Sequence, residues 1–363
     1  MGDALDRYRS MRDFARTPEP SGDAQPPAAE IPRFVIQEHH ATALHWDLRL
    51  ERDGVLASWA VPKGIPPDPR VDHLAVQTED HPMLYLEFSG SIPEGEYGGG
   101  HLRIWDRGTY RCEKWSEREV MITLEGERAR GRYVLFHTGA RNWMLHRMDP
   151  PADPSRELLP ASFTLVDEVD GGLPEDQSAW SFEAALGGRR VVVVSQGGRA
   201  RVEDGAGREV SDRWPEARSI GPALGTLEVA LEAEIVVAGG DGRPDGALLA
   251  RREAAAAESA ARRLASRHPA GVILLDLLWL EGHATSPLPF GQRRALLEKV
   301  VPAGGAWQVA PAHPGEGAAL LAAAEAQALP GVRARRLDTG YQAGALRFTA
   351  AGATGPTTGG PRA

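Results

Sequence analysis

The stretch that decides the fold of the first half of this chain is Gln37-Glu38-His39-His40-Ala41-Thr42-Ala43-Leu44-His45-Trp46-Asp47-Leu48-Arg49-Leu50. From Leu44 onward it alternates apolar and polar residues, which predicts a β-strand because successive side chains of a strand point to opposite faces. One face is apolar and can pack into a core; it carries Leu44, Trp46, Leu48 and Leu50. The other face presents an imidazole, a carboxylate and a guanidinium, each about 7 Å from the next by strand geometry.

The residue types on the polar face of this strand are suited to two kinds of chemistry. It consists of His45, Asp47 and Arg49, and His39 lies just upstream. Two imidazoles and a carboxylate suit a Mn, Zn or Fe ion, and an arginine beside them suits a phosphate oxyanion. The alternative is a half-buried strand whose polar face is merely solvated. The pattern alone leaves both interpretations open.

Composition narrows the class of protein. A length of 363 residues allows about two domains. The sequence has no run of 18 apolar residues, so it predicts no membrane span. Its charged N-terminal residues are not typical of a secretory signal. The single cysteine, Cys112, excludes an internal disulfide. We therefore expect a cytoplasmic protein. Residues 1–150 carry 19 basic and 24 acidic side chains and the rest 22 and 26, so sequence-independent DNA affinity should be modest.

Turn residues and composition shifts divide the chain. We expect an N-terminal arm and linker over 1–30, a β-barrel over 31–150, a linker over 151–178, an α+β domain over 179–350 and a disordered tail over 351–363. Many short strands separated by turns are typical of an antiparallel or mixed barrel. The strands expected there are 33–37, 44–52, 56–61, 73–77, 84–89, 101–106, 120–125, 131–138 and 143–147, after a short helix over 4–14.

The second half mixes strand and helix patterns, which favours an α+β domain. The strands expected there are 189–195, 227–237 and 272–280, and the helical stretches are 247–266, 291–300 and 316–328.

Several motifs in the first half resemble one known family. They are Gln37-Glu38-His39-x5-His45-Trp46-Asp47-Leu48-Arg49-Leu50, Trp59-Ala60-Val61-Pro62-Lys63-Gly64, Glu79-Asp80-His81-Pro82, Ile92-Pro93-Glu94-Gly95-Glu96-Tyr97-Gly98, Arg12-Asp13-Phe14-x2-Thr17-Pro18-Glu19-Pro20 and Gly139-Ala140-Arg141-Asn142-Trp143. Together they resemble the 3′-phosphoesterase domain of bacterial DNA ligase D, over about residues 5–150.

This resemblance implies a manganese-dependent enzyme that trims DNA 3′ ends during non-homologous end joining. In that family a 3′-terminal ribonucleoside is removed first and then the remaining 3′-phosphate, which leaves a 3′-hydroxyl. By position, the metal ligands are His39, His45 and Asp47; Arg49 and His81 contact the scissile phosphate, with His81 placed for proton transfer; Gln37, Lys63, Glu79 and Tyr85 support activity; and Arg12, Asp13 and Glu19 close over the site.

The sequence departs from the family pattern at a few positions. His73 stands where the family usually has an arginine, which puts one phosphate contact in doubt. His40, Glu38 and Ala43 replace a usual aspartate, lysine and arginine, and we expect these changes to alter DNA contact rather than metal binding.

Two other classes of function stay open. His45, Asp47 and the distant His81 match the ligand types of a non-haem iron oxygenase, although no arginine follows His81 before Arg103 to hold a keto acid. The other alternative is a non-catalytic DNA-repair scaffold, which the His73 departure keeps open.

The second half contains Val272-Ile273-Leu274-Leu275-Asp276-Leu277-Leu278-Trp279-Leu280-Glu281-Gly282 and Gly331-Val332-x-Ala334-x-Arg336-Leu337-Asp338-x2-Tyr341. With these motifs, residues 179–350 resemble the adenylation domain of an ATP-dependent DNA ligase, a nucleotidyltransferase fold, but they lack its catalytic residues. The family's Lys-x-Asp-Gly motif corresponds to Ala185-Leu186-Gly187-Gly188, and its Glu-Gly-Val-x-Ala-Lys motif to Pro330-Gly331-Val332-Arg333-Ala334-Arg335. The only lysine after residue 150 is Lys299, and a phosphoramide adduct needs an amine nucleophile. The family's closing lysine motif is also missing from residues 346–350. We therefore expect no use of ATP and no ligation.

The partners implied by these resemblances are DNA 3′ ends in a primer–template and, among proteins, Ku or a separate ligase or polymerase of end joining. No membrane partner is expected.

Overall fold

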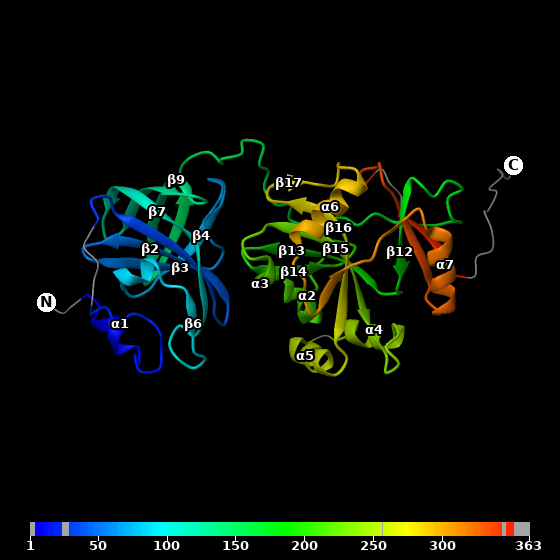
Figure 1. The fold of residues 1–363 in the computed structure, drawn as a ribbon, viewed down its shortest axis with the longest axis horizontal. Helices are drawn as coiled ribbons and strands as arrows, with labels where there is room; N and C mark the ends of the chain where they lie inside the picture. The colour runs from blue at the N-terminus through cyan, green and yellow to red at the C-terminus, as the bar shows by residue number, and fades with distance from the viewer. Residues whose placement is uncertain (1–3, 24–28, 256, 343–345, 352–363) are drawn as a thin grey trace. The chain divides into compact units, whose positions relative to one another are not determined.

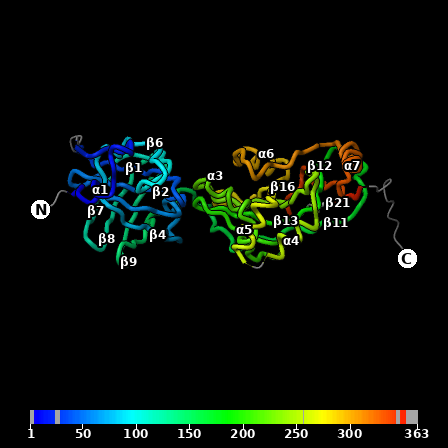
Figure 2. The backbone as a smooth tube through the Cα atoms, turned by 90° about the horizontal axis from the view of Figure 1, so that it is seen from below, coloured from blue at the N-terminus to red at the C-terminus, as the bar shows by residue number. Residues whose placement is uncertain are grey.

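The computed structural model describes all of the chain except residues 1–3, 24–28, 256, 343–345 and 352–363. The chain divides into two compact units, Met1–Ser155 and Arg156–Ala363, which we describe separately (Figures 1 and 2). All but the first residue of the tail expected over 351–363 lies outside the described residues. No helix in the described part of the chain is long and apolar enough to cross a membrane.

The first unit is a closed antiparallel barrel of eight strands, counted over its described residues (Figure 1). In spatial order they are β1 (Arg33–His40), β2 (Leu44–Arg52), β3 (Val55–Val61), β4 (Asp72–Gln77), β10 (Asn142–Arg147), β9 (Arg130–Gly139), β8 (Glu119–Gly126) and β7 (Gly100–Trp115). Pairing of β1 with β7 closes the ring, which leaves no open edge in this path. The predicted barrel is confirmed.

Strand β2 has the bounds and the apolar face that its alternation predicts. Trp46, Leu48 and Leu50 are fully buried in the barrel core. Its polar face is buried as well, since Asp47 is 4% and Arg49 3% exposed. The interpretation of a merely solvated polar face is therefore wrong.

The N-terminal arm and one short helix cover the buried polar face. Helix α1 (Asp6–Ser10) is shorter than expected; Leu5 and Tyr8 at this helix pack with Leu56 and Met83 in a second apolar cluster. The strand predicted over 84–89 is instead a 3₁₀ helix, η1 (Met83–Leu86). The amide of Gln37 donates to the main-chain carbonyls of residues 85 and 88, and this tertiary contact stabilises a turn that the apolar run alone does not reveal. Two short strands complete the unit, β5 (His81–Pro82) beside β3 and β6 (Gly90–Ile92) beside β7.

The second unit is an α+β domain built on two sheets, as predicted. One sheet has the order β11 (Glu168–Asp170), β21 (Leu346–Ala350), β20 (Gly331–Arg336), β12 (Trp180–Ala185) and β19 (His313–Pro314). The other has β14 (Arg199–Glu203), β13 (Arg189–Gln196), β15 (Val229–Val237), β16 (Ala270–Leu280) and β17 (His283–Ala284), with β18 (Trp307–Val309) also paired to β16.

Helices cover these sheets. They are η2 (Ser211–Arg213), α2 (Pro215–Arg218), α3 (Ile220–Leu224), α4 (Gly246–Glu253), α5 (Glu258–Arg267), α6 (Phe290–Val300) and α7 (Gly317–Ala326). In Figure 2, α7 lies beside β12, and it packs Leu321 against Phe182 of β12 and Val332 of β20. The single helical stretch expected over 247–266 is two helices, α4 and α5.

The segment expected as a linker over 151–178 contains ordered structure. It includes strand β11, which pairs with β21. Leu159, Phe163 and Leu165 pack against the buried side chains of β13 and β16. These apolar residues can bury surface against the sheet, which is why the segment packs onto the second unit.

Candidate functional site

Three metal-ligating side chains meet in the first unit, at the end of the barrel where β1 and β2 join. His39 and His45 face each other in the β1–β2 register, and their rings lie 4.6 Å apart. One nitrogen of each ring and one oxygen of Asp47 all lie within 4.8 Å of one another. These are the three residues that the family resemblance implies as ligands, and their donor set suits Mn, Zn or Fe.

Main-chain carbonyls orient both imidazoles toward this centre. Nε2 of His39 lies 2.9 Å from the carbonyl oxygen of Gly98, so its N–H donates there and Nδ1 faces Asp47 at 3.5 Å. Nδ1 of His45 lies 3.0 Å from the carbonyl oxygen of Ala43, so Nε2 faces Asp47 at 3.6 Å. A hydrogen bond on the far nitrogen commonly sets the tautomer of a metal-binding histidine. The unprotonated nitrogens therefore converge on one point.

Arg49 holds the carboxylate of Asp47 ionised. Its guanidinium donates to Oδ2 of Asp47 at 2.9 Å, to Oε1 of Gln37 at 2.7 Å and to Oγ of Ser58 at 3.0 Å. Burial on its own would raise the pKa of Asp47, but the charge of Arg49 and the contact with His39 hold it below its ordinary value. An ionised carboxylate in a buried site is what a cation requires.

His81 lies beside this cluster as a neutral imidazole. Its Nδ1 is 2.8 Å from the carbonyl oxygen of Glu79 and its Nε2 is 3.3 Å from a guanidinium nitrogen of Arg12. These partners assign the hydrogen to Nδ1 and a lone pair to Nε2. Burial, followed by the charges of Arg49 and Arg12, lowers the pKa of His81 well below 6.5. Nε2 is therefore a proton acceptor at neutral pH.

The N-terminal arm is bonded into the same site. Arg12 donates to Glu19 at 2.6 Å and to Glu79 at 3.1 Å. Tyr85 donates its hydroxyl to Glu19, and its ring lies 4.9 Å from the guanidinium of Arg49. Burial raises the pKa of Tyr85, which keeps the hydroxyl protonated as a donor. The arm thus closes over Arg49 and His81 through buried polar contacts.

The structure does not bring every expected residue into contact with the cluster. Lys63 is exposed in the turn after β3; Val61 pairs with Trp46, so this turn lies at the His45 end of β2. Asp13 is exposed, and its carboxylate accepts from the main-chain N–H of residue 15 within its own turn. His73 is buried, and its Nδ1 lies 2.8 Å from the carbonyl oxygen of Gly64, where it anchors the Lys63 turn.

Sequence reasoning did not single out some residues that the structure places here. Ser58 contacts Arg49, and it could have been found because it lies directly opposite Arg49 in the β2–β3 register. Thr17 donates to Glu19 at 2.8 Å, and Tyr8 packs its ring under Arg12 at 3.9 Å. Gly98 acts through its carbonyl group, for which the residue type carries no signal.

In the second unit, arginines occupy the space between the two sheets. Arg335 of β20 donates to Glu232 at 2.5 Å and lies 3.6 Å from Asp276. Arg333 donates to Glu234 at 2.6 and 3.1 Å. All three carboxylates have fully buried side chains. Each therefore has an arginine partner inside the domain.

Three further arginines complete this network. Arg190 donates to Glu232 at 2.5 Å, Arg293 to Asp276 at 2.7 Å and Arg294 to Glu183 at 2.8 Å. Burial raises the pKa of Glu183 to about 7, although Arg294 opposes that shift. We call the set of Arg190, Arg293, Arg294, Arg333, Arg335, Glu183, Glu232, Glu234 and Asp276 the intersheet ion network.

The turn at 185–188, where the ligase family carries its lysine, is bound to the same network. Ala185 is buried, and the main-chain N–H of Gly188 donates to Glu234 at 2.7 Å. A Cβ at Gly188 would lie 2.3 Å from the carbonyl oxygen of Ile235, so only glycine allows this approach. Lys299, by contrast, is exposed in the last turn of α6. No amine is therefore present at this turn.

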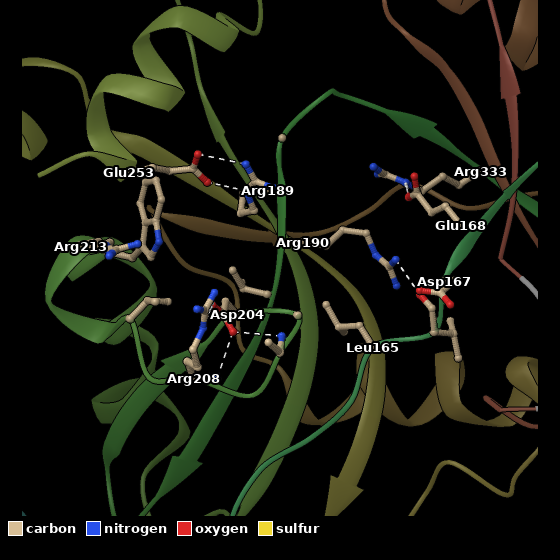
Figure 3. Close-up of a pocket in the computed structure, with 17 residues that line it drawn as sticks. Leu165, Asp167, Glu168, Arg189, Arg190, Asp204, Arg208, Arg213, Glu253 and Arg333 are labelled. Carbon is tan, nitrogen blue, oxygen red and sulfur yellow. Dashed lines mark hydrogen bonds and ion pairs between the residues drawn. The ribbon is translucent and has the colours of Figure 1, made fainter.

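A cavity of about 630 Å³ borders the network (Figure 3). Its arginines are largely bonded to carboxylates: Arg189 to Glu253, Arg208 to Asp204, and Arg333 to Glu168. Arg213 also lines it and is exposed. Because most arginines in the lining are paired with carboxylates, we expect the cavity to attract the phosphates of a nucleotide only weakly.

Two family profiles match the chain: "DNA Ligase D 3′-phosphoesterase domain" over residues 37–137 and "ATP dependent DNA ligase domain" over residues 164–347. The chain belongs to the ATP-dependent DNA ligase domain family, whose profile covers half of it, and this region follows the match to the 3′-phosphoesterase domain of DNA ligase D.

The relatives that match this chain include LigD proteins of two bacteria. The multifunctional non-homologous end joining protein LigD of Mycolicibacterium smegmatis is 36% identical over 95% of this chain and 44% of its own length. The LigD protein of Mycobacterium tuberculosis (strain CDC 1551 / Oshkosh) is 39% identical over the same shares of the two chains. A probable DNA ligase of Streptomyces coelicolor is 30% identical over 53% of this chain and 37% of its own. The chain thus spans less than half the length of these relatives.

Solved structures of similar chains were found as well. Mycobacterial DNA ligase D complexed with ATP and MES has a TM-score of 0.42 and 26% identity, covering 52% of this chain and 60% of that one. The ligase domain of M. tuberculosis LigD has a TM-score of 0.42 and 28% identity, covering 52% and 57%.

We predict that His81 makes stability depend on pH in the metal-free protein. Below pH 6.5 the unfolded chain binds a proton at His81 and the folded chain does not. The free energy of unfolding therefore falls by up to about 1.4 kcal/mol for each further unit by which the pH is lowered. The His81→Asn variant should lack this component. Urea unfolding at pH 7.5, 6.5 and 5.5 in a chelator measures the difference, with the exposed His137→Asn as the control variant. Equal pH dependence in wild type and His81→Asn would contradict the neutral assignment.

We also predict that the intersheet ion network tolerates no loss of Arg335. Arg335→Met leaves Glu232 with Arg190 and Asp276 with Arg293 as their remaining partners, so one buried negative charge loses its compensation, which should cost about 3 kcal/mol, the low end for a broken buried ion pair. The neighbouring Arg336→Met removes an arginine whose side chain is 49% exposed, and should cost about 1 kcal/mol or less. Urea unfolding compares the two variants, and equal losses would count against the network.

Proposed function

We propose that the first unit is a divalent-metal-dependent phosphoesterase that trims 3′-ribonucleotide and 3′-phosphate ends of DNA to 3′-hydroxyl ends in non-homologous end joining. The observation that carries this proposal is the convergence of His39, His45 and Asp47 within 4.8 Å. Arg49 and His81 lie beside it with the chemistry that a phosphate ester needs: a fixed guanidinium and a neutral imidazole.

In this proposal, His39 Nδ1, His45 Nε2 and an oxygen of Asp47 hold the metal, and manganese is the ion we expect. A bound divalent cation supplies charge neutralisation at a phosphate oxygen. The site fits such an ion because both imidazoles already direct a lone pair at an ionised carboxylate.

The residues of the chain itself perform the remaining tasks. Arg49 donates to a phosphate oxygen and holds the phosphorus in place. His81 takes the proton of the attacking water at Nε2, after this water has displaced the Arg12 guanidinium from that atom. The water oxygen forms a bond to phosphorus, the bond from phosphorus to the leaving oxygen breaks, and the leaving oxygen takes a proton from solvent, to which His81 then releases its own. Before substrate binds, Arg12 closes the arm side of the site and orients His81 through its contact with Nε2.

We further propose that the second unit neither adenylylates nor ligates. Ala185 stands where the family carries its nucleophilic lysine, and its buried methyl group cannot form a phosphoramide. The intersheet ion network supports the same conclusion, because its carboxylates are already bound by arginines. The proposed partners are DNA 3′ ends in a primer–template, with Ku or a separate ligase or polymerase of end joining as protein partners.

A non-catalytic scaffold stays the second candidate because of His73. This residue binds the Gly64 carbonyl instead of presenting the arginine that the family usually carries. The oxygenase alternative relied on His81 as a ligand, but the clustered ligand atoms come from His39, His45 and Asp47.

The proposed function predicts metal-dependent shortening of a 5′-labelled primer–template that ends in one ribonucleotide, and dephosphorylation of its 3′-phosphate counterpart. His45→Ala should lose at least about 100-fold in rate, since even outer-shell changes at metal sites cost 10–100-fold. His40→Ala is the matched control, because His40 lies next to the ligands but bonds Glu38 instead. Inactivity of the wild type with Mn, Zn, Co and Fe would contradict the proposal and favour the scaffold.

The second unit predicts the absence of a covalent adenylate. The protein incubated with radiolabelled ATP and Mg or Mn should carry no label after denaturing electrophoresis, whereas an active ATP-dependent ligase run alongside should. A labelled band at the mass of this chain would refute the claim.

A further inference from the structure

Tyr97 presents an aromatic ring at the mouth of the proposed phosphoesterase site. Its side chain belongs to the glycine-rich loop 93–99, and the residue is 43% exposed. The hydroxyl donates to Oε2 of Glu79 at 3.4 Å, and the ring lies 5.4 Å from the guanidinium of Arg12. Glu79 and Arg12 both contact His81. The ring therefore borders the place where the proton transfer would occur.

The loop that carries Tyr97 also touches the metal cluster and the arm. The carbonyl of Gly98 accepts from His39 at 2.9 Å, and Glu96 pairs with Arg16 of the arm at 2.9 Å. The backbone is tight, since a Cβ at Gly99 would lie 2.8 Å from the carbonyl oxygen of Pro93. Tyr97 is thus one residue from a group that orients a ligand, in a loop with little freedom to move.

Neither folding nor the contact with Glu79 accounts for an exposed ring at this position. The ring lies outside the apolar clusters of the barrel, over the described residues. Its hydrogen bond is long, and Glu79 already accepts from Arg12 at 3.1 Å. A rigid, half-exposed aromatic beside a phosphate site has the properties of a stacking platform for a base.

The arm decides which base can reach this ring. Arg12 and Glu19 are nearly fully buried, so the arm closes its side of the site. The retained DNA strand extends over many nucleotides and must leave through the open side. The unit that is removed is a single nucleoside, so it is the shorter of the two groups and the one that we assign to the arm side. Tyr97 is bonded to the arm side through Glu79 and Arg12.

We propose that Tyr97 stacks on the base of the terminal 3′-nucleoside that the enzyme removes, and so determines its preference for an end that carries a nucleoside. This inference rests on the proposed function. Stacking on a π-face is tolerant of base identity, so any of the four bases would be accepted. A 3′-phosphate end has no base beyond the scissile bond, and it gains nothing from the ring.

The test compares kcat/KM for a ribonucleotide-terminated primer with kcat/KM for the same primer ending in a 3′-phosphate. Tyr97→Ala should lower the ratio of the two values about tenfold, in line with the loss of one stacked base. Tyr97→Phe should keep the ratio, because the ring remains. Leu74→Ala, at an exposed leucine on the barrel surface, controls for the loss of exposed apolar area.

A second substrate isolates the base itself. A primer that ends in a ribose without a base should slow the wild type by the same factor as Tyr97→Ala does, and the variant should be no slower on it than on the normal end. Two results would overturn the inference: an unchanged ratio in Tyr97→Ala, which includes an equal loss on the ribonucleotide and 3′-phosphate ends, or the same fall of the ratio in Tyr97→Phe. Wild-type inactivity on both substrates would instead refute the proposed function, and this inference with it.

Discussion

The buried guanidinium of Arg49 is the constraint on which the first unit depends. A cation that is 3% exposed needs hydrogen-bond partners inside the protein. Three of the five N–H groups of Arg49 donate to Asp47 on its own strand, Gln37 on β1 and Ser58 on β3, which leaves two for the phosphate of the proposed function. One side chain thus joins three neighbouring strands on the inner polar face. It also leaves the carboxylate of Asp47 ionised and directed at two imidazoles, so the same ion pair that stabilises the barrel prepares the metal centre that we propose.

The second unit also contains buried carboxylates and arginines, but there the arginines occupy the carboxylates. Glu232, Glu234 and Asp276 are as buried as Asp47, but each is bonded to arginines from elements that pack across the intersheet space. Breaking a buried ion pair is costly because one charge stays unpaired. We therefore expect these carboxylates to stay bound by the chain instead of by a metal or nucleotide. Asp47 differs because Arg49 bonds only its Oδ2, while Oδ1 faces Nε2 of His45 at 3.6 Å.

The sequence was informative where a pattern repeats. Strand β2 could be predicted to the residue because its apolar alternation is strong, and the ligand set followed from a motif in which β1 and β2 bring His39 opposite His45. Contacts between distant segments could not be predicted. Tyr85 donates to Glu19 across 66 positions, and the helix at 83–86 replaces the strand that its apolar residues favour. Backbone groups such as the Gly98 carbonyl have no sequence signature at all.

The central claim is that His39, His45 and Asp47 form one metal centre whose ligand atoms are already oriented. The most direct measurement is a crystal structure of the protein soaked in MnCl₂, with diffraction recorded above and below the manganese absorption edge. We predict one strong anomalous peak about 2.0–2.3 Å from Nδ1 of His39, Nε2 of His45 and an oxygen of Asp47. A peak bound through the other ring nitrogens, or manganese only at other carboxylates, would contradict the account.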